Sequence, residues 1–154
     1  FIAAGSTCAE MTKVLPNIPL QVFTDGLVTA LELSKYSNIE ATMIGGQINT
    51  DSVRSSGFKV FEELNKLHFD FSFLGTDAYR PDFGFVCCSA HAAALFQTLI
   101  ERSDKTVVLM DSSKVDAIRA ARSIPTNQVD IVVSDGGLSN ATAKALSQAG
   151  VMLL

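Results

Sequence analysis

The sequence predicts an α/β fold, a mostly parallel sheet with helices on both faces, and two observations lead to this prediction. Short apolar, β-branched runs alternate with helical stretches almost throughout the chain. Such continuous apolar runs are typical of parallel strands that are buried on both faces. The four prolines all fall between the predicted elements, where breakers of helices and strands belong.

The first half of the chain contains six predicted elements, beginning with a short strand. They are a strand at Phe1–Ala3, a helix at Thr7–Leu15, a strand at Leu20–Thr24, a helix at Leu27–Tyr36, a strand at Ile39–Ile44 and a helix at Phe58–Leu67. In the second of these helices, Leu27, Ala30, Leu31 and Leu33 share an apolar side, as expected for a helix that packs on a sheet.

The second half continues the alternation. Its predicted elements are a strand at Phe69–Leu74, a helix at Ser89–Arg102, strands at Thr106–Met110 and Val129–Val133, a helix at Ala141–Gln148 and a strand at Val151–Leu154. We expect Gly150 to cap the last helix, because glycine tolerates the left-handed conformation that commonly ends helices.

The composition fits a single domain, residues 1–154. The chain has 154 residues, of which 47% are hydrophobic, and a chain of this length buries about 68–70% of the surface that its unfolded form exposes. No apolar run reaches the roughly 18 residues needed to span a bilayer, so we expect no membrane association. Because the chain begins inside a predicted strand and without an initiator methionine, we expect it to be a fragment of a longer protein.

Charge and cysteine content narrow the function classes. The net charge is −4, and the 12 Lys and Arg residues never form a run. A nucleic-acid surface needs clustered cations to displace phosphate counterions, so we do not expect this domain to contact DNA or RNA by itself.

Three cysteines, two of them adjacent, argue against a disulfide framework and for a reducing compartment. We therefore expect a cytoplasmic protein.

Small, acidic and hydroxylated residues gather directly after the predicted strands. The carboxyl ends of the strands of an open α/β sheet meet at one edge, and ligands bind there beside helix N-termini. We therefore expect a ligand site at this edge. The segments that follow strands are Gly5, Asp25-Gly26, Gly45-Gly46, Gly75, Asp111 and Asp135-Gly136.

Gly5, Ser6 and Thr7, between the first strand and the first helix, are the first candidates for binding an anion. Glycine lets the backbone approach an anion, and the amides that open a helix have no intrahelical acceptor. The alternative is that Ser6 or Thr7 simply caps the helix. The segment matches neither a Walker loop nor a dinucleotide fingerprint, and we expect no cofactor.

Thr24, Asp25 and Asp77 are candidates at two further strand ends. Thr24 can donate to a ligand, and Asp25 either contacts the ligand or caps the helix that begins at Leu27. Asp77 accepts sugar hydroxyls, acts as a base, or only forms a turn.

The segment Asp111-Ser112-Ser113-Lys114 follows a strongly apolar strand and combines an acid, two hydroxyls and an ammonium group. Lys114 is a compact cation that suits phosphate. The alternative is an Asx turn followed by a solvated lysine.

A metal site is one interpretation of Cys87, Cys88 and His91, because Cys87 and His91 are four residues apart on a predicted helix. Zinc needs three or four protein ligands, and His68 is the only other histidine. We therefore expect no metal, no catalytic Cys–His pair, and residues that pack near the ligand instead.

Seven short motifs, taken in order, resemble the C-terminal effector-sensing domain of DeoR-type bacterial transcriptional repressors. They are Gly5-Ser6-Thr7, Thr24-Asp25-Gly26, Ile44-Gly45-Gly46, Ser56-Gly57, Asp70-Phe71-Ser72-Phe73-Leu74-Gly75, Ile100-Glu101-Arg102-Ser103 and Asp111-Ser112-Ser113-Lys114. The last motif is the most specific. The chain departs from the family pattern at Ala3 and Ala92, where the family usually has Asp and Glu.

The resemblance implies a fold similar to that of pentose-phosphate isomerases and glucosamine-phosphate deaminases, and a pocket for a phosphorylated sugar. It implies an upstream winged helix-turn-helix that contacts DNA, and we expect a homo-oligomer, either a dimer or a tetramer. The residues expected at the phosphate are Gly5, Ser6, Thr7 and Lys114. Those expected at the sugar are Thr24, Asp25, Gly45, Gly46, Asp77, His91 and Asp111.

Three functions stay open at this point. The first, which we favour, is the sensing of a phosphorylated sugar by the effector domain of a repressor of sugar metabolism, without catalysis. The second is a sugar-phosphate isomerase, for which Asp77 is the only good candidate base. The third is an oligomerisation module with a vestigial pocket, because Ala3 and Ala92 lack the carboxylates that hold sugar hydroxyls.

Overall fold

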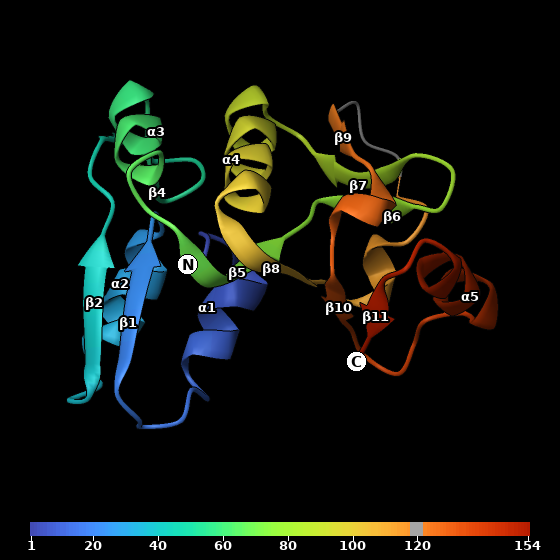
Figure 1. Cartoon of the computed structure of the whole chain (residues 1–154), viewed down its shortest axis with the longest axis horizontal. Coiled ribbons are helices and arrows are strands. Elements are labelled where there is room, and N and C mark those ends of the chain that lie inside the picture. Colours follow the sequence, from blue (N-terminus) through green and yellow to red (C-terminus); the bar gives the residue numbers. More distant parts are fainter. Residues whose placement is uncertain (118–121) are drawn as a thin grey trace.

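A central parallel sheet runs through the molecule, as the sequence predicts (Figure 1). The computed structural model describes residues 1–117 and 122–154. The strands of this sheet are β1 (Leu20–Thr24), β2 (Ile39–Met43), β5 (Phe69–Gly75), β8 (Ser103–Leu109), β10 (Ile131–Val133) and β11 (Met152–Leu153).

Residues 1–3 join the two halves of this sheet. Ile2 forms parallel bridges with Thr24 of β1 on one side and with Phe73 of β5 on the other. The spatial order is therefore β2, β1, residues 1–3, β5, β8, β10, β11, and the strand pairs are parallel. The chain runs outward from residues 1–3 to β2 and then returns to β5, so the strand order reverses between residues 1–3 and β5.

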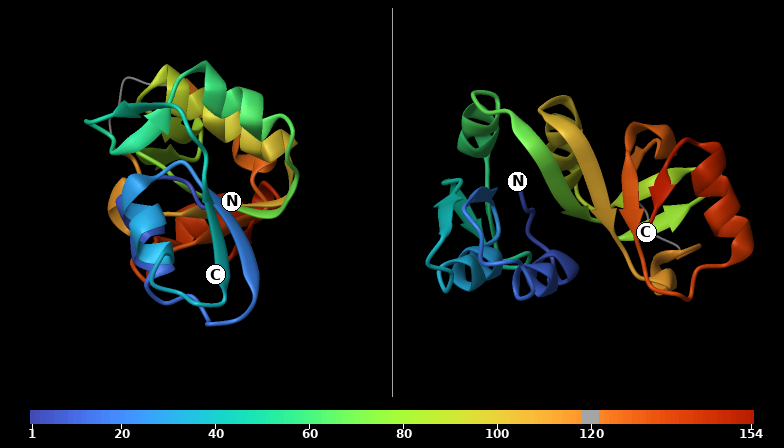
Figure 2. Two further views of the ribbon diagram at one scale, coloured as in Figure 1. Left: turned by 90° about the vertical axis from the view of Figure 1, so that its left-hand side faces the viewer. Right: turned by 60° about the horizontal axis from the view of Figure 1, so that its bottom comes forward.

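Apolar residues cover both faces of the sheet. Neighbouring residues of one strand point to opposite faces, and accordingly Val108 belongs to one core cluster while Val107 and Leu109 belong to another. Figures 1 and 2 show α3 and α4 on one side of the sheet and α1 and α2 on the other. The helices are α1 (Ser6–Thr12), α2 (Leu27–Leu33), α3 (Phe58–Leu64), α4 (Ala90–Glu101) and α5 (Asn140–Gln148).

Several short elements were not predicted, because strands of three or four residues are too short to show an apolar period. The hairpin β3–β4 follows β2, and a second antiparallel sheet has the order β6-β7-β9. Two 3₁₀ turns, η1 and η2, lie in the second half of the chain. Their bounds are β3 (Gln47–Asn49), β4 (Arg54–Ser56), β6 (Ala78–Arg80), β7 (Gly84–Cys87), β9 (Arg122–Ile124), η1 (Ser112–Lys114) and η2 (Thr126–Gln128).

The predicted bounds of several elements were too generous, and the helices predicted at Thr7–Leu15 and Phe58–Leu67 end at Thr12 and Leu64. The predicted helix Leu27–Tyr36 ends at Leu33, because the amides of Lys35 and Tyr36 bond three residues back and close a 3₁₀-type turn. The strand predicted from Val129 begins at Ile131, since η2 occupies the residues just before Val129.

The cap predicted at Gly150 is confirmed. Gly150 has a φ of +84° and follows Ala149, the C-cap residue of α5. Its amide donates to the Ser147 carbonyl and the Val151 amide donates to the Leu146 carbonyl, the two bonds of a Schellman motif. Among the described helices, none combines the length and apolar character needed to cross a bilayer.

Candidate functional site

A cavity of about 230 Å³ lies at the carboxyl edge of the sheet, where the strand order reverses. The ends of residues 1–3 and of β5 are neighbours there, and the chain leaves them in opposite directions. Such switch points are the usual ligand sites of open α/β sheets. The cavity is lined by Ala3, Ala4, Gly5, Ser6, Thr7, Arg54, Leu74, Gly75, Thr76, Asp77, Cys87, Ala92, Leu95, Phe96 and Lys114.

Gly5, Ser6 and Thr7 form one wall of this cavity. Gly5 has φ +150° and ψ +152°, a region that is essentially restricted to glycine, and it is the N-cap residue of α1. The alternative prediction that Ser6 or Thr7 caps the helix is wrong, because no side chain caps α1. The two hydroxyl groups are exposed beside the loop and are available to a ligand.

Asp77 lies across from this loop, just beyond the end of β5. Its Oδ2 accepts a hydrogen bond of 2.7 Å from the Cys88 amide, so one carboxylate oxygen already fixes the segment that leads into α4. The neighbouring Thr76 hydroxyl donates to the Ala78 and Val86 carbonyls and accepts from the Val86 amide. Asp77 thus lines the cavity with a carboxylate that already holds a backbone amide, whereas Thr76 is engaged with the backbone.

Lys114 also lines the cavity. It is the last residue of η1, the 3₁₀ turn that follows β8 in the chain. The Asp111 carboxylate accepts from the Ser113 amide and caps this 3₁₀ turn, and Ser112 donates to the Asp135 carboxylate. Asp111 thus forms the turn that the sequence analysis named as an alternative, and it is absent from the cavity lining. The turn places Lys114 in the lining of the same cavity as Gly5.

Thr24 and Asp25 are fully buried and do not line the cavity. The prediction that Asp25 caps α2 is wrong, since Gly26 is the N-cap residue and no side chain caps that helix. The Asp25 Oδ1 accepts from the Ala4 amide at 2.8 Å, which places this carboxylate directly behind the cavity wall. Burial raises the pKa of Asp25, although the guanidinium of Arg54 acts against that rise.

Arg54, which the sequence analysis did not single out, is a cavity residue. Its Nε lies 2.9 Å from the Asp25 Oδ2, an ion pair whose N–H is not aligned for a hydrogen bond, and its side chain is 11% exposed. Its Nη2 donates to the Ala4 carbonyl at 3.3 Å. No local pattern marks Arg54, because it is a single arginine in a three-residue strand and its partner, Asp25, follows the distant strand β1.

Gly45, Gly46 and His91 also lie outside the cavity lining. The His91 ring packs edge-on against Phe61, with centroids 5.3 Å apart. Desolvation, followed by the charge of Arg54, lowers the pKa of His91, which favours the neutral form of the ring. Of the three residues, Gly46 has a clear packing role: a Cβ there would lie 2.5 Å from the Ser56 carbonyl oxygen.

Gly46→Ala is expected to destabilise the protein by about 1–3 kcal/mol, because its methyl group would overpack against the backbone of Ser56. Gly45→Ala is the matched control, since a Cβ at Gly45 has no neighbour within 4 Å, and its effect is expected to stay within about 0.5 kcal/mol. Urea denaturation of the two variants measures the difference. Equal stabilities would contradict the close packing of Gly46.

The remaining cavity wall is small and apolar. Ala3 and Ala92, the two positions that depart from the family pattern, both lie in this wall together with Leu95 and Phe96. Compared with the pattern named above, the cavity therefore lacks two carboxylates, and Asp77 is the only acidic residue among the described residues that line it.

Cys87 belongs to the wall as a buried thiol. Burial, followed by the charge of Asp77, raises its pKa to about 12. The expected helical spacing of Cys87 and His91 is wrong, because Cys87 ends β7 and only His91 belongs to α4. No group of three His, Cys, Asp or Glu residues suited to a metal ion is present within residues 1–117 and 122–154.

An open α/β sheet with a polar cavity at its switch point defines the molecule as a ligand-binding domain. Residues 1–136 match the family described as the DeoR C-terminal sensor domain. The chain belongs to this family. The family is one of sensor domains rather than of enzymes, in agreement with the expectation that the chain is not an enzyme.

Three curated relatives carry names of transcriptional regulators. The chain is 31% identical over 146 residues to the uncharacterized HTH-type transcriptional regulator YulB of Bacillus subtilis, covering 95% of this chain and 57% of YulB. It is 28% identical over 152 residues to the HTH-type transcriptional regulator GolR of Listeria innocua, covering 98% and 60%. It is 26% identical over 155 residues to a putative aga operon transcriptional repressor of Escherichia coli O157:H7, covering 100% and 58%. The chain thus spans about three fifths of the length of these relatives.

Proposed function

We propose that this chain is the effector-sensing domain of a DeoR-type transcriptional repressor of sugar metabolism, and that it binds a phosphorylated sugar in the cavity at the switch point. The phosphate contacts Gly5, Ser6, Thr7 and Lys114. The observation that carries the proposal is that this loop and Lys114, from opposite halves of the chain, line one cavity.

The chemistry of the lining supports a phosphorylated sugar. Backbone amides, hydroxyl groups and an ammonium group are donors that suit phosphate oxygens. The carboxylate of Asp77 suits a sugar hydroxyl, and the apolar side chains of Leu95 and Phe96 suit the C–H face of a sugar ring.

The sensed signal reaches DNA through a segment outside this chain. In the proposed protein, an upstream winged helix-turn-helix contacts the operator, the sensor domains form a homo-oligomer, and the protein is cytoplasmic. A ligand shifts the equilibrium between two arrangements of such an oligomer only by its difference in affinity for them. The matched family and the regulators named above support this reading.

Thermal unfolding of the purified chain with a panel of pentose and hexose phosphates, each paired with its free sugar, tests the proposal. A sugar phosphate at 100 times its Kd is expected to stabilise the fold by about 2.7 kcal/mol. If no sugar phosphate stabilises the chain, the proposal is wrong and an oligomerisation module is favoured. Turnover of a sugar phosphate that is lost in Asp77→Ala would instead favour an isomerase.

Lys114→Ala is expected to weaken binding of the phosphorylated sugar by about 10- to 100-fold, because it removes a charge-assisted hydrogen bond to phosphate. The weak binding of the matched free sugar is expected to stay unchanged. Isothermal titration calorimetry measures both affinities, and Lys144→Ala, an exposed lysine on α5, is the control. Equal losses for the phosphorylated and free sugars would remove Lys114 from the phosphate site.

A further inference from the structure

We propose that Arg54 is the side chain that anchors the effector's phosphate, beside the loop formed by Gly5, Ser6 and Thr7. This inference rests on the proposed function of the cavity. It adds a binding residue that the sequence motifs did not contain, and it assigns the phosphate end of the ligand to the side of the cavity nearest β1.

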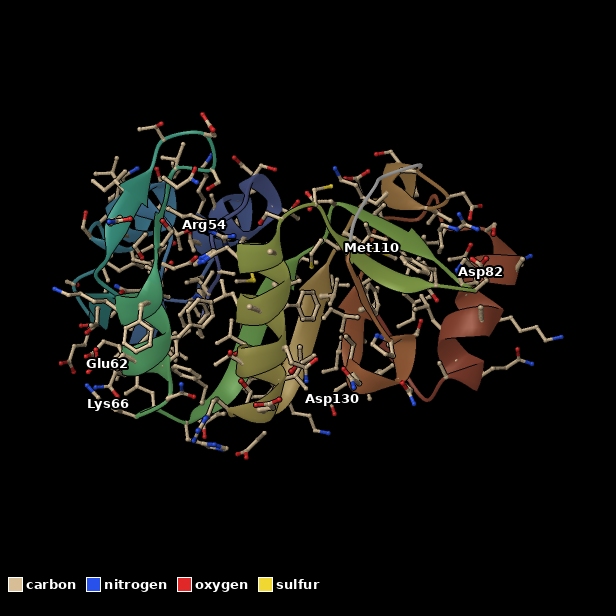
Figure 3. All side chains as sticks on the ribbon, turned by 90° about the horizontal axis from the view of Figure 1, so that it is seen from above. Arg54, Glu62, Lys66, Asp82, Met110 and Asp130 are labelled. Carbon is tan, nitrogen blue, oxygen red and sulfur yellow. The ribbon has the colours of Figure 1, made fainter. Side chains whose placement is uncertain are left out.

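The guanidinium lies at the beginning of this loop. Its Nη2 donates to the carbonyl of Ala4, and its Nε faces Asp25, whose other oxygen accepts from the Ala4 amide. Both backbone groups of the residue that precedes Gly5 are therefore held by the Arg54–Asp25 pair. Figure 3 shows Arg54 between the β3–β4 hairpin and α1.

Arg54 keeps donors for a ligand. A guanidinium group has five N–H donors in a fixed planar fork. Two of them face Asp25 and Ala4, and no other described residue accepts a hydrogen bond from Arg54. Because Arg54 lines the cavity, an anion there can accept from the remaining donors in the two-pronged geometry that arginine offers to phosphate.

Stability alone is a poor explanation for this buried pair. An ion pair taken out of water is often no better for stability than apolar residues of the same size. The pair is also imperfect, since the Nε–H is not aligned with the Asp25 carboxylate. A guanidinium that is 11% exposed and turned toward a polar cavity is therefore better explained by an anionic ligand than by folding.

The backbone holds Arg54 in place from both sides. The Val53 carbonyl accepts from the Leu27 amide, the Ser55 amide donates to the Asp25 carbonyl, and Arg54 itself bridges Gly26. Val53 has a φ of +48°, which is rare for a β-branched residue. This strained turn and the buried Asp25 together aim the side chain toward Ala4 and the cavity.

The two cations reach the cavity from opposite sides. Arg54 comes from β4, which bridges to Gly26 just after β1, and Lys114 comes from the turn after β8. Lys114 has a flexible stem and a point charge, whereas Arg54 is held by Asp25 and Ala4 and offers a fork. We therefore assign the main, oriented phosphate contact to Arg54 and a supporting charge to Lys114.

The test is the affinity of the chain for inorganic phosphate, measured by chemical shifts of backbone amides during a titration at constant ionic strength. Arg54→Lys keeps the charge opposite Asp25 and removes the fork, and it is expected to weaken phosphate binding at least about tenfold. Arg80→Lys is the matched control, because Arg80 is an exposed arginine that pairs with Asp82 away from the cavity, and no change is expected. The shifts in the wild type are expected at Gly5, Ser6 and Thr7.

A second variant covers the case in which Arg54→Lys does not fold. Asp25→Asn/Arg54→Gln removes both buried charges, and it is expected to weaken phosphate binding by about 10- to 100-fold. Acetate in place of phosphate separates the two anion classes, and tighter binding of acetate would overturn the assignment to phosphate.

The outcomes separate this inference from the function on which it rests. A wild type that binds neither inorganic phosphate nor any sugar phosphate contradicts both. If Arg54→Lys binds phosphate as tightly as the wild type does, the proposed role of Arg54 is wrong. The proposed function of the cavity is unaffected by that result. An equal loss in Arg80→Lys also overturns the proposed role of Arg54, because the loss would then not depend on the position of the guanidinium at the cavity.

Discussion

Arg54→Met is expected to lower the free energy of unfolding by about 3–5 kcal/mol, because it leaves the carboxylate of Asp25 buried without its counterion. The Asp25 side chain is fully buried, and its Oδ2 is 2.9 Å from the Arg54 Nε. Methionine replaces the apolar stem of the arginine as far as the position of Nε and carries no charge, so the loss reports mainly the missing guanidinium group. Urea denaturation at pH 7, followed by circular dichroism, measures the loss.

The double variant Asp25→Asn/Arg54→Met is the control. It removes both charges, and the amide oxygen introduced in place of the carboxylate can still accept from the Ala4 amide. We expect it to recover most of the stability that Arg54→Met loses, since replacing a whole buried ion pair is often neutral. A single variant as stable as the wild type would show that Asp25 and Arg54 are not coupled.

The loss in Arg54→Met depends on pH in a direction set by Asp25. Burial already raises the pKa of Asp25 above its ordinary value of 3.8, and Arg54 limits that rise, so removal of Arg54 raises the pKa further. A carboxyl group whose pKa is raised in the folded state favours folding below its unfolded pKa, and this advantage is lost as the pH rises through the folded pKa. The deficit of Arg54→Met relative to the wild type is therefore largest at neutral pH and shrinks toward pH 4.

Phe96→Ala is expected to destabilise the protein by about 3–5 kcal/mol, because it empties a large part of the core beside the cavity. Phe96 is 2% exposed, and its ring stacks on that of Phe85 with centroids 6.5 Å apart. It also lines the cavity, so its loss joins a core void to the ligand site. Thermal or urea unfolding measures the change.

Phe58→Ala is the matched control for this prediction. Phe58 is 80% exposed at the beginning of α3, and the same truncation there is expected to change stability by less than about 0.5 kcal/mol. Phe96 carries no hydrogen-bond donor, so Phe96→Ala is expected to retain binding of inorganic phosphate that Arg54→Lys loses. Similar stabilities of the two Phe→Ala variants would contradict the placement of Phe96 in the core.

Part of the candidate site was accessible from sequence, because it depends on position along the chain. Residues that directly follow strands of a parallel sheet meet at one edge, whatever the details of packing. This rule placed Gly5, Asp77 and Lys114 at one cavity before any contact was known. The rule does not predict the direction of a side chain. The sequence therefore suggested that Asp25 contacts the ligand or caps a helix. In the structure, Asp25 lies behind the cavity wall and pairs with Arg54.

By itself, the sequence determined the parallel sheet, the two apolar faces and the last helix cap at Gly150, because apolar periodicity and glycine conformation are local properties. Only the tertiary structure showed that the order of strands reverses beside residues 1–3. It also showed that Arg54, in the three-residue strand β4, lines the cavity, and that Ala3 and Ala92 line the same cavity. The physical reason is that these features depend on contacts between residues that are far apart in the chain. The sequence around a residue does not indicate which distant residues it will contact.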